Sequence, residues 1–369
     1  MPKNIDENKD NLWKNHLDKV AVTALGKHIK EAFPKFELQK FIDAVVDENY
    51  TSLELKERIN AMAVQLKVYL PDDYSQVIKI ISKVAPKVRG FENWTLLTYV
   101  EKYGLDNFEQ SIAAMELLTR YSTAEFAIRP FMIKYTDQMM PILHRWAEDD
   151  NEHVRRLAAE GSRPRGVWVA HIESFKKDPT PVLELLEQLK ADESLYVRKA
   201  VANNLNDISK EHPKKVIALC KRWQKDKNQH TDWIIKQSCR TMIKKGLPGA
   251  LALFGFDDNP KVSVTMIHPK KKKHAIGDEI EFGYELLSNS PKKQKLAVDY
   301  KIHYQKKNGN RSAKVFKLSV KDLPPKKKIS LRAKQSFADM STRKHFPGAH
   351  TIELIVNGQV AHTFEFELK

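Results

Sequence analysis

The chain has 369 residues, of which 41% are hydrophobic and 30% charged, and its formal net charge is +16 at pH 7. This length and composition predict two or three domains with real cores, and the basic balance favours a polyanionic partner, most simply nucleic acid. A basic protein without such a partner stays open. Cys220 and Cys239 lie in no CxxC or zinc-ligand spacing, which argues against a disulfide framework and a structural metal.

The N-terminal segment MPKNIDENKDNLWKN is polar and lacks the apolar core of a signal peptide. No apolar run approaches the roughly 20 residues that a helix needs to span a bilayer. The two cysteines fit a reducing compartment. We therefore predict a cytoplasmic protein that has no contact with a membrane.

Residues 1–255 are predicted to form an all-helical domain, because apolar residues recur there with a period of about 3.6 and no convincing alternating strand interrupts them. Breaks between the periodic segments mostly carry Pro, Gly, Asp or Asn. The clearest helical segments are LDKVAVTALGKHIKEAF (17–33), ELQKFIDAVV (37–46), SLELKERINAMAVQLKVYL (52–70) and YSQVIKIISKVA (74–85).

An internal repeat occupies the second half of this domain. HRWAEDDNEHVRRLAAEGSRPR (144–165) matches EQLKADESLYVRKAVANNLND (187–207), and KRWQKDKNQHTDWIIKQSCRTMIKKG (221–246) is a weaker third copy. A period near 40 residues with two helices per unit is typical of HEAT-type solenoids, which stack side by side and form a concave face. Repeats are weak before residue 120.

Each copy is predicted to have one packed face and one polar stripe. The packed positions are Val154, Leu157, Ala158 and Gly161 in the first copy, and Val197, Ala200, Val201 and Asn204 in the second. The polar stripes are Arg156, Glu160 and Arg163, then Lys199, Asn203, Asn206 and Asp207, then Lys236, Arg240 and Lys244. Stacked repeats would join these stripes into one mostly basic surface.

Such a surface could follow a phosphate backbone. Its carboxylates would repel phosphate, so phosphate binding does not explain why they are present. An ordinary i,i+4 pair between Arg156 and Glu160 is one alternative.

Residues 256–369 are predicted to form a small immunoglobulin-like β-sandwich, since seven short alternating runs fill them and Asn308-Gly309 and Asn357-Gly358 mark turns. The runs are KVSVTMI (261–267), DEIEFGYELL (278–287), LAVDYKIHY (296–304), KVFKLSV (314–320), KISLRAK (328–334), HTIELIV (350–356) and HTFEFEL (362–368). A fibronectin-type sandwich fits equally well.

Most of the positive charge belongs to this second part. Residues 255–369 hold 23 Lys and Arg against 12 Asp and Glu, a net +11 of the chain's +16. The basic clusters are PKKKKH (269–274), PKKQK (291–295), QKKNGNR (305–311) and PPKKKIS (324–330). Loops in such a domain often present binding groups, so a direct contact with nucleic acid is one interpretation. Lysines that protect edge strands and keep the domain soluble are the other.

Several long segments resemble the AlkC branch of the HEAT-like-repeat DNA alkylation repair glycosylases. They are GFENWTLLTYVEKYGLDNFEQS (90–111), YSTAEFAIRPFM (121–132), NEHVRRLAAEGSRPR (151–165), YVRKAVANNLNDISKEHP (196–213) and RTMIKKGLPGALALFG (240–255). The resemblance covers about residues 15–255. Some members of this branch carry a C-terminal immunoglobulin-like domain, which fits residues 256–369 by architecture more than by motif.

The resemblance implies a monofunctional glycosylase that removes cationic alkylated bases from double-stranded DNA, namely 3-methyladenine, 3-methylcytosine and, as a further candidate, 1-methyladenine. It also implies that the lesion stays largely stacked while the concave face reaches its sugar, unlike enzymes that flip the base into a deep pocket. The basic β-domain would grip DNA beside the lesion. The implied protein works as a monomer in the bacterial cytosol, and no motif in the sequence suggests a cofactor.

By motif position, the resemblance implies three catalytic carboxylates: Glu160 nearest the sugar, with Glu125 and Asp207 completing an acidic pocket. Arg156 and Arg163 would clamp the phosphates beside the lesion, and Trp168 would pack against the deoxyribose or the edge of the lesion. Further DNA-binding candidates are Arg165, Lys199, Asn203, Lys236, Arg240 and Lys244.

Structural alternatives stay open for three of these residues. Trp168 could be a buried aromatic between repeats, Glu125 a helix-start partner of Arg129, and Asp207 a helix C-terminal cap. A non-catalytic scaffold that binds nucleic acid or an acidic protein, and an enzyme acting on RNA, are the competing functions.

Overall fold

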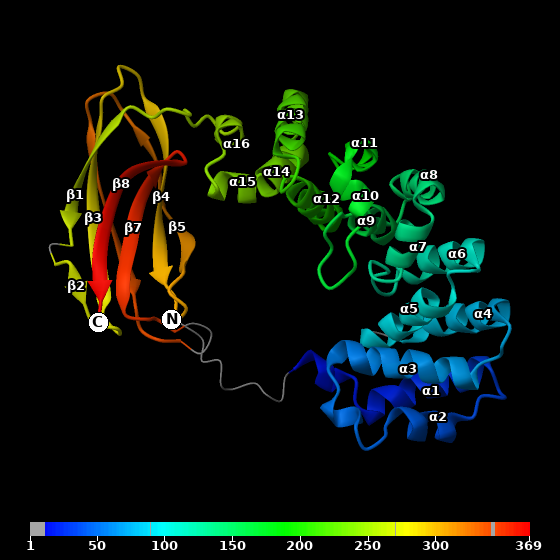
Figure 1. The fold of residues 1–369 in the computed structure, drawn as a ribbon. Helices are drawn as coiled ribbons and strands as arrows, with labels where there is room; N and C mark the ends of the chain where they lie inside the picture. The colour runs from blue at the N-terminus through cyan, green and yellow to red at the C-terminus, as the bar shows by residue number, and fades with distance from the viewer. Residues whose placement is uncertain (1–11, 89, 270, 341–343) are drawn as a thin grey trace. The chain divides into compact units, whose positions relative to one another are not determined.

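The computed structural model describes residues 12–88, 90–269, 271–340 and 344–369 (Figure 1). The chain is helical up to Ala252 and forms strands from Val262 onward. The helices are α1 (Lys19–Ala32), α2 (Leu38–Val45), α3 (Leu55–Tyr69), α4 (Tyr74–Val84), α5 (Phe91–Tyr103), α6 (Phe108–Leu118), α7 (Arg129–Lys134), α8 (Thr136–Trp146), α9 (Glu152–Gly161), α10 (Glu173–Lys177), α11 (Thr180–Gln188), α12 (Leu195–Ile208), α13 (Pro213–Trp223), α14 (Gln229–Ser238), α15 (Arg240–Lys244) and α16 (Pro248–Ala252). Short 3₁₀ turns occupy Trp13–His16, Tyr50–Ser52, Ala85–Lys87 and Gln224–Asp226.

The strands are β1 (Val262–His268), β2 (Lys273–His274), β3 (Glu279–Ser288), β4 (Gln294–Gln305), β5 (Arg311–Leu323), β6 (Lys328–Ser336), β7 (Gly348–Val356) and β8 (Gln359–Leu368). All seven predicted strands are present, and the two-residue β2 is an addition that the sequence pattern did not reveal. In the part of the chain that the structure describes, no helix is long and apolar enough to cross a membrane.

The chain divides into two compact units. The first ends at Glu211 and also includes Lys227–Ser238, and the second comprises His212–Asp226 and Cys239–Lys369. The short helices α13, α15 and α16 therefore belong with the sandwich. The change from helices to strands nevertheless lies where the sequence places it, and we retain 1–255 and 256–369 as the proposed domains.

Local sequence explains where the repeat helices of the first unit begin. Asn151 precedes α9 and its side chain accepts a hydrogen bond from the amide of His153 at 2.9 Å. Ser194 does the same for α12 through the amide of Tyr196, at 3.2 Å. These N-caps satisfy amides that the helix itself leaves without a partner, so each repeat helix starts at a defined residue.

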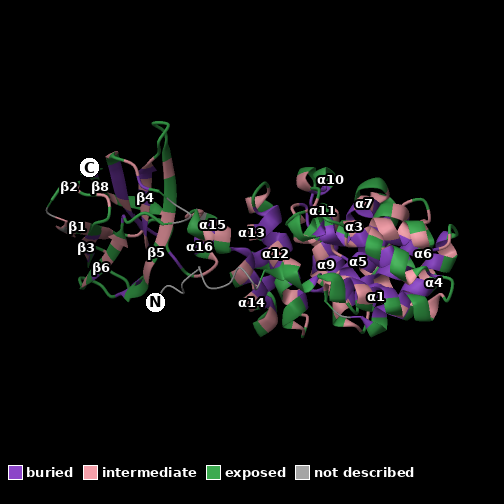
Figure 2. Cartoon of the chain, turned by 90° about the horizontal axis from the view of Figure 1, so that it is seen from below, coloured by how far each residue is buried: buried purple, intermediate pink, exposed green. Residues whose placement is uncertain are grey.

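The first two repeats stack as predicted. Every predicted packed position of both copies is buried (Figure 2). Asn204 of α12 donates hydrogen bonds to the Ala159 carbonyl of α9 at 2.8 Å and to the Ser162 hydroxyl at 3.0 Å. Apolar burial brings the helices together, and the two hydrogen bonds from the buried amide nitrogen of Asn204 favour this register, because leaving that donor unpaired would be costly.

The third copy differs from its prediction. A single helical stripe through Lys236, Arg240 and Lys244 requires one continuous helix, but α14 ends at Ser238 and α15 begins at Arg240. The break also coincides with the boundary between the two compact units. Lys236 lies in the first unit, whereas Arg240 and Lys244 lie in the second. The stripe of the third copy is therefore not a continuation of the first two.

The second unit is a sandwich of a three-stranded sheet, in the order β1-β3-β6, and a five-stranded sheet, in the order β2-β8-β7-β4-β5. Antiparallel pairing predominates, and only the short β2 runs parallel to its neighbour β8. Alternate residues of both sheets fill the core, with Phe282, Tyr284, Ile302, Ile352 and Phe337 among the most buried. The two predicted Asn-Gly turns join β4 to β5 and β7 to β8.

Gly358 is expected to tolerate no side chain. Its φ is +81°, and an added Cβ would lie 2.4 Å from the carbonyl oxygen of Gly246 and 2.5 Å from its Cα. Gly309 in the other turn has the same φ of +81° but no atom within 4 Å of such a Cβ. Because both alanine variants bear the same backbone penalty, Gly358→Ala should cost about 1–3 kcal/mol more than Gly309→Ala. Urea unfolding of the two variants measures this difference, and equal losses would contradict the close contact.

Asp299 on β4 should make stability depend on pH. Burial raises the pKa of its carboxyl from 3.8 to about 6, although Lys317 and Lys244 lower it in part. Between about pH 4 and pH 6 the native state therefore binds more protons than the unfolded state, so stability falls as pH rises through this window and stays lower above it. Asp299→Asn should raise the free energy of unfolding by roughly 1–3 kcal/mol at pH 8 and change it little at pH 4. Thermal melts at both pH values check this, and an equal effect at both would contradict it.

Candidate active site

The structure brings the three predicted carboxylates into one ion-pair network within the first unit. Glu125 lies in the loop before α7, Glu160 lies in the last turn of α9, and Asp207 lies in the last turn of α12. Arg163 pairs with Glu160 and with Asp207, and Arg156 pairs with Glu125. Two arginines thus link three carboxylates that come from separate elements.

Arg163 lies between two carboxylates. Its Nε and Nη2 donate to Oδ2 of Asp207 at 2.8 and 2.7 Å, and its Nη1 donates to Oε1 of Glu160. Burial opposes the charge of this guanidinium, but Glu160 and Asp207 outweigh burial and raise the pKa of Arg163. The helix α9 ends at Gly161, so Arg163 does not continue the helical stripe that the sequence predicted. The chain turns there, and this turn allows the side chain to reach α12.

Arg156 is held in a similar way on the other side of Glu160. It donates to the Glu125 carboxylate and the Thr123 hydroxyl, and its Nη2 lies 3.7 Å from Oε2 of Glu160. Its guanidinium carbon lies 5.0 Å from the ring centroid of Tyr196, within range of a cation–π contact. The i,i+4 pair between Arg156 and Glu160 exists, but it is longer than the contacts that Arg156 makes with Glu125 and Thr123.

Both arginines were predicted to clamp phosphates. In the structure the guanidinium groups of both arginines form ion pairs with carboxylates, so the two arginines hold the acidic cluster together. A phosphate contact by either arginine stays a prediction.

The three carboxylates differ in accessibility. The side chains of Glu125, Glu160 and Asp207 are 22, 10 and 4% exposed, respectively. Both oxygens of Asp207 have partners, since Oδ1 also accepts from Lys210 at 2.8 Å. Asp207 is therefore the most enclosed of the three, whereas Glu125 and Glu160 retain exposed surface that a ligand could meet.

Arg129 organises the loop that follows α9. It donates to the carbonyls of Gly161 at 3.0 Å, Arg163 at 2.7 Å and Ala170 at 3.1 Å. Burial, with a contribution from the nearby charge of Arg163, lowers the pKa of Arg129 to about 10. This engagement differs from the predicted alternative in which Arg129 pairs with Glu125, whose carboxylate instead contacts Arg156.

Trp168 lies on this loop and points into solvent. Its relative exposure is 70%, which rules out the alternative of a buried aromatic between repeats. Its φ is +60°, a conformation that costs an L-residue about 1–2 kcal/mol and persists only when the surroundings impose it. The indole ring of Trp168 is therefore accessible to a partner.

The remaining predicted DNA-binding residues do not join the network. Arg165 pairs with Glu211 in the first unit. Lys199 and Asn203 lie on α12, where Lys199 is exposed and Asn203 is partly buried, and Lys236 is exposed on α14. Arg240 and Lys244 lie on α15 of the second unit and are exposed. Their contact with DNA stays a prediction.

The basic clusters of the sandwich fall at both of its ends. β4 and β5 pair from Gln294–Leu323 to Gln305–Arg311, so residues 291–295 and 324–330 lie at one end and residues 305–311 lie at the other. Of the cluster 269–274, Lys273 and His274 reach that second end, because they form β2, which pairs with the last residues of β8. Leu368 of β8 pairs with Gly348, which lies against Gln305. The clusters therefore do not form one continuous patch.

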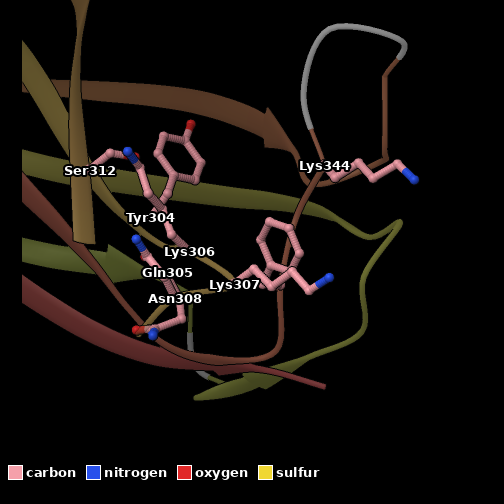
Figure 3. A pocket seen from close by; sticks show the side chains of 8 residues that line it. Tyr304, Gln305, Lys306, Lys307, Asn308, Ser312 and Lys344 are labelled. Atoms are coloured by element: carbon pink, nitrogen blue, oxygen red, sulfur yellow. The ribbon is translucent and has the colours of Figure 1, made fainter. Parts of the chain in front are cut away.

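The second end of the sandwich contains a pocket of about 450 Å³. Three lysines and two aromatic residues line it, namely Lys306, Lys307, Lys344, Tyr304 and Phe346 (Figure 3). Ammonium groups beside aromatic rings suit an anionic ligand that carries a ring, as nucleotides do.

Within residues 12–88, 90–269, 271–340 and 344–369, no group of three His, Cys, Asp or Glu side chains is arranged to hold a metal ion.

Comparisons with known proteins cover nearly the whole chain. A family model described as "DNA alkylation repair enzyme" matches residues 118–242, and one described as "Uncharacterised protein YhaZ, C-terminal Ig-like domain" matches residues 263–369. A structure of Pseudomonas fluorescens alkylpurine DNA glycosylase AlkC, bound to DNA containing an abasic site analog, is 36% identical, covers 96% of this chain and 99% of its own, and has a TM-score of 0.88. The chain belongs to the AlkC-type family of DNA alkylation repair enzymes.

A further relative is the "Uncharacterized protein YhaZ" of Bacillus subtilis (strain 168). It is 42% identical over 347 residues, which span 94% of this chain and 96% of that protein. Together these matches confirm the resemblance inferred from the sequence and the architecture of helical repeats followed by an immunoglobulin-like domain. The matched repair-enzyme segment, residues 118–242, contains all three carboxylates of the network.

The sequence prediction missed several residues of this candidate site. Arg129 lies within the motif EFAIRP, but the sequence suggests it only as a partner of Glu125. Tyr196 directly precedes Val197-Arg198-Lys199, which matches Val154-Arg155-Arg156 of the first copy, and Lys210 follows Asp207 by about one helical turn. These positions in the sequence could have drawn attention to both residues.

Proposed function

We propose that this protein is a monofunctional DNA glycosylase that hydrolyses the N-glycosidic bond of cationic alkylated bases in double-stranded DNA. The proposed substrates are 3-methyladenine, 3-methylcytosine and 1-methyladenine. The observation that carries the proposal is the cluster of three carboxylates held by two arginines, on the same loop-and-helix assembly that exposes Trp168. A polyanion-binding surface alone would gain nothing from such carboxylates, because they repel phosphate.

The chemistry of the substrate explains this arrangement. Alkylation at a ring nitrogen gives the base a positive charge, so it leaves readily and needs little acid catalysis. The sugar becomes oxocarbenium-like as the bond breaks, as it does in glycoside hydrolysis. A fixed carboxylate stabilises that cation electrostatically and can orient and deprotonate the attacking water. Glu160 is our first choice for this role, with Glu125 beside it and Asp207 completing the acidic pocket.

Trp168 would pack against the deoxyribose of the lesion. An indole face can attract the developing sugar cation and shield it from bulk water. This role needs an accessible ring, and the 70% exposure of Trp168 meets that requirement. The lesion itself would remain largely stacked, so that selectivity comes from the charge and lability of the base.

Basic groups outside the network would hold the DNA. On α12 and α14 these are Lys199 and Lys236, with the neutral amide of Asn203 beside them as a hydrogen-bonding group, and the lysine-lined pocket of the sandwich offers a second set. Each phosphate contact releases counterions, so binding should weaken steeply with added salt. The proposed enzyme acts as a monomer without a cofactor, in the cytosol where bacterial DNA lies.

The test is release of a free base from a duplex oligonucleotide that carries a single 3-methylcytosine. Wild-type protein is incubated without metal or nucleotide, the released base is identified by mass spectrometry, and the abasic site is detected by alkaline cleavage. The same duplex without the lesion is the control. Base release from the damaged duplex alone is expected. Tight binding of both duplexes, with no release from 3-methylcytosine or a stable 3-methyladenine analogue, would instead identify a non-catalytic scaffold.

A further inference from the structure

Lys56 makes a long-range contact to the loop that exposes Trp168. It is the second residue of α3, and its Nζ donates a hydrogen bond to the Trp168 carbonyl oxygen at 2.9 Å. The two residues are 112 positions apart in the sequence. α3 belongs to the N-terminal part of the helical unit, where repeats are weak and no site residue was predicted.

Two other groups interact with the ammonium of Lys56. It lies 4.9 Å from the ring centroid of Phe126, and it acts electrostatically on the carboxyl of Glu101 from α5. Phe126 directly follows Glu125 of the carboxylate network, and its ring stacks on Trp94 with centroids 4.5 Å apart. Lys56 therefore connects the Trp168 loop to a rigid aromatic pair beside the proposed site.

A cavity of about 440 Å³ adjoins this contact. Lys56, Glu101, Phe126, Arg129 and Trp168 all contribute to its lining. The backbone around Trp168 is thus not packed tightly against a core on this side, and specific polar contacts must define its course. Arg129 holds the loop at Ala170, and Lys56 holds it at Trp168 itself.

We infer that Lys56 is a positioning residue that keeps the Trp168 indole in the orientation needed to meet the sugar of the lesion. This inference rests on the proposed function for its catalytic consequence. The positive φ of Trp168 is a conformation that the residue would leave if it were free to do so, and the Lys56 hydrogen bond opposes that change. An indole that samples several orientations would seldom be placed correctly when the glycosidic bond breaks.

The experiment compares Lys56→Met and Lys56→Arg with Lys67→Met. Lys67 lies three turns further along the same helix and makes only a 4.0 Å contact with Asp72, so its variant controls for loss of a lysine from α3. Lys56→Met should lower kcat/KM for 3-methylcytosine excision about tenfold. Lys56→Arg, which can still donate to the Trp168 carbonyl, should recover most of this loss, and Lys67→Met should behave as wild type.

A double-mutant cycle separates positioning of Trp168 from a general structural effect. If Lys56 acts through the indole, Lys56→Met should lower excision in the wild-type background but have little further effect in a Trp168→Phe background. Equal fold-losses in both backgrounds would show that Lys56 does not act through Trp168 and would overturn the inference.

A spectroscopic readout judges the same contact without relying on activity. The chain has six tryptophans, and labelling with 5-fluorotryptophan gives each a ¹⁹F resonance. The resonance absent from Trp168→Phe is that of Trp168. Lys56→Met should shift or broaden this resonance and leave those of the buried Trp146 and Trp223 unchanged. An unchanged Trp168 resonance overturns the inference even if the wild type excises bases. If the wild type excises nothing, the proposed function is overturned. The spectroscopic result then still shows whether Lys56 holds Trp168.

Discussion

Glu160→Gln is expected to reduce excision of 3-methylcytosine by about 10²–10³-fold while leaving DNA binding intact or slightly tighter. The amide has nearly the same shape as the carboxylate, so it can still contact Arg163, but it carries no charge to stabilise the sugar cation and cannot deprotonate water. Removing a negative charge near the DNA backbone reduces repulsion, which is why affinity should not fall. Single-turnover excision and fluorescence-anisotropy titration measure the two quantities separately.

The matched control for this variant is Glu152→Gln. Glu152 lies in the first turn of the same helix α9 and is exposed. Its carboxylate accepts a hydrogen bond from the Ser194 hydroxyl, which lies outside the network. Its variant should retain wild-type excision. Glu125→Gln and Asp207→Asn complete the series. If excision survives all three changes within the network, the assignment of the active site to these carboxylates is wrong.

Arg163→Met is expected to cost the helical unit about 3–5 kcal/mol of stability, the largest loss that we anticipate from a single substitution. Arg163 is the shared partner of Glu160 and Asp207, and the side chains of all three are at most 10% exposed. Removing it leaves two buried carboxylates close together without this counter-charge, which penalises the folded state by desolvation and by mutual repulsion. The shift of the urea midpoint, followed by circular dichroism at 222 nm, measures the loss.

Arg165→Met is a suitable control, because it removes another arginine only two residues further along the chain. The pair between Arg165 and Glu211 is more exposed, at 31 and 27%, so its loss should cost less than about 1 kcal/mol. A triple variant that combines Arg163→Met with Glu160→Gln and Asp207→Asn should regain part of the stability, since it removes the two carboxylates that the arginine neutralised. Similar losses for the two single arginine variants would refute the view that Arg163 neutralises a buried cluster.

The sequence predicted the composition of the candidate site better than its geometry. Glu125, Glu160 and Asp207 were named from motifs, and the packed positions of α9 and α12 followed from helical periodicity. The partners of these carboxylates were not predictable from spacing, because Arg163 reaches Asp207 across 44 residues and only after the chain leaves α9. Arg156 and Arg163 were consequently interpreted as phosphate ligands, whereas the structure places them among carboxylates.

Short-range patterns therefore determined the elements of this protein: 3.6-residue periodicity for the helices, alternation for the seven strands, and Asn-Gly pairs for two turns. Motif resemblance added the family. Tertiary structure alone decided which charges neutralise one another, where the third repeat breaks at Cys239, that Trp168 faces solvent, and that Lys56 holds its carbonyl. The physical reason is that periodicity reports which face of an element is buried, whereas ion pairs and long-range hydrogen bonds depend on how separate elements are placed in space.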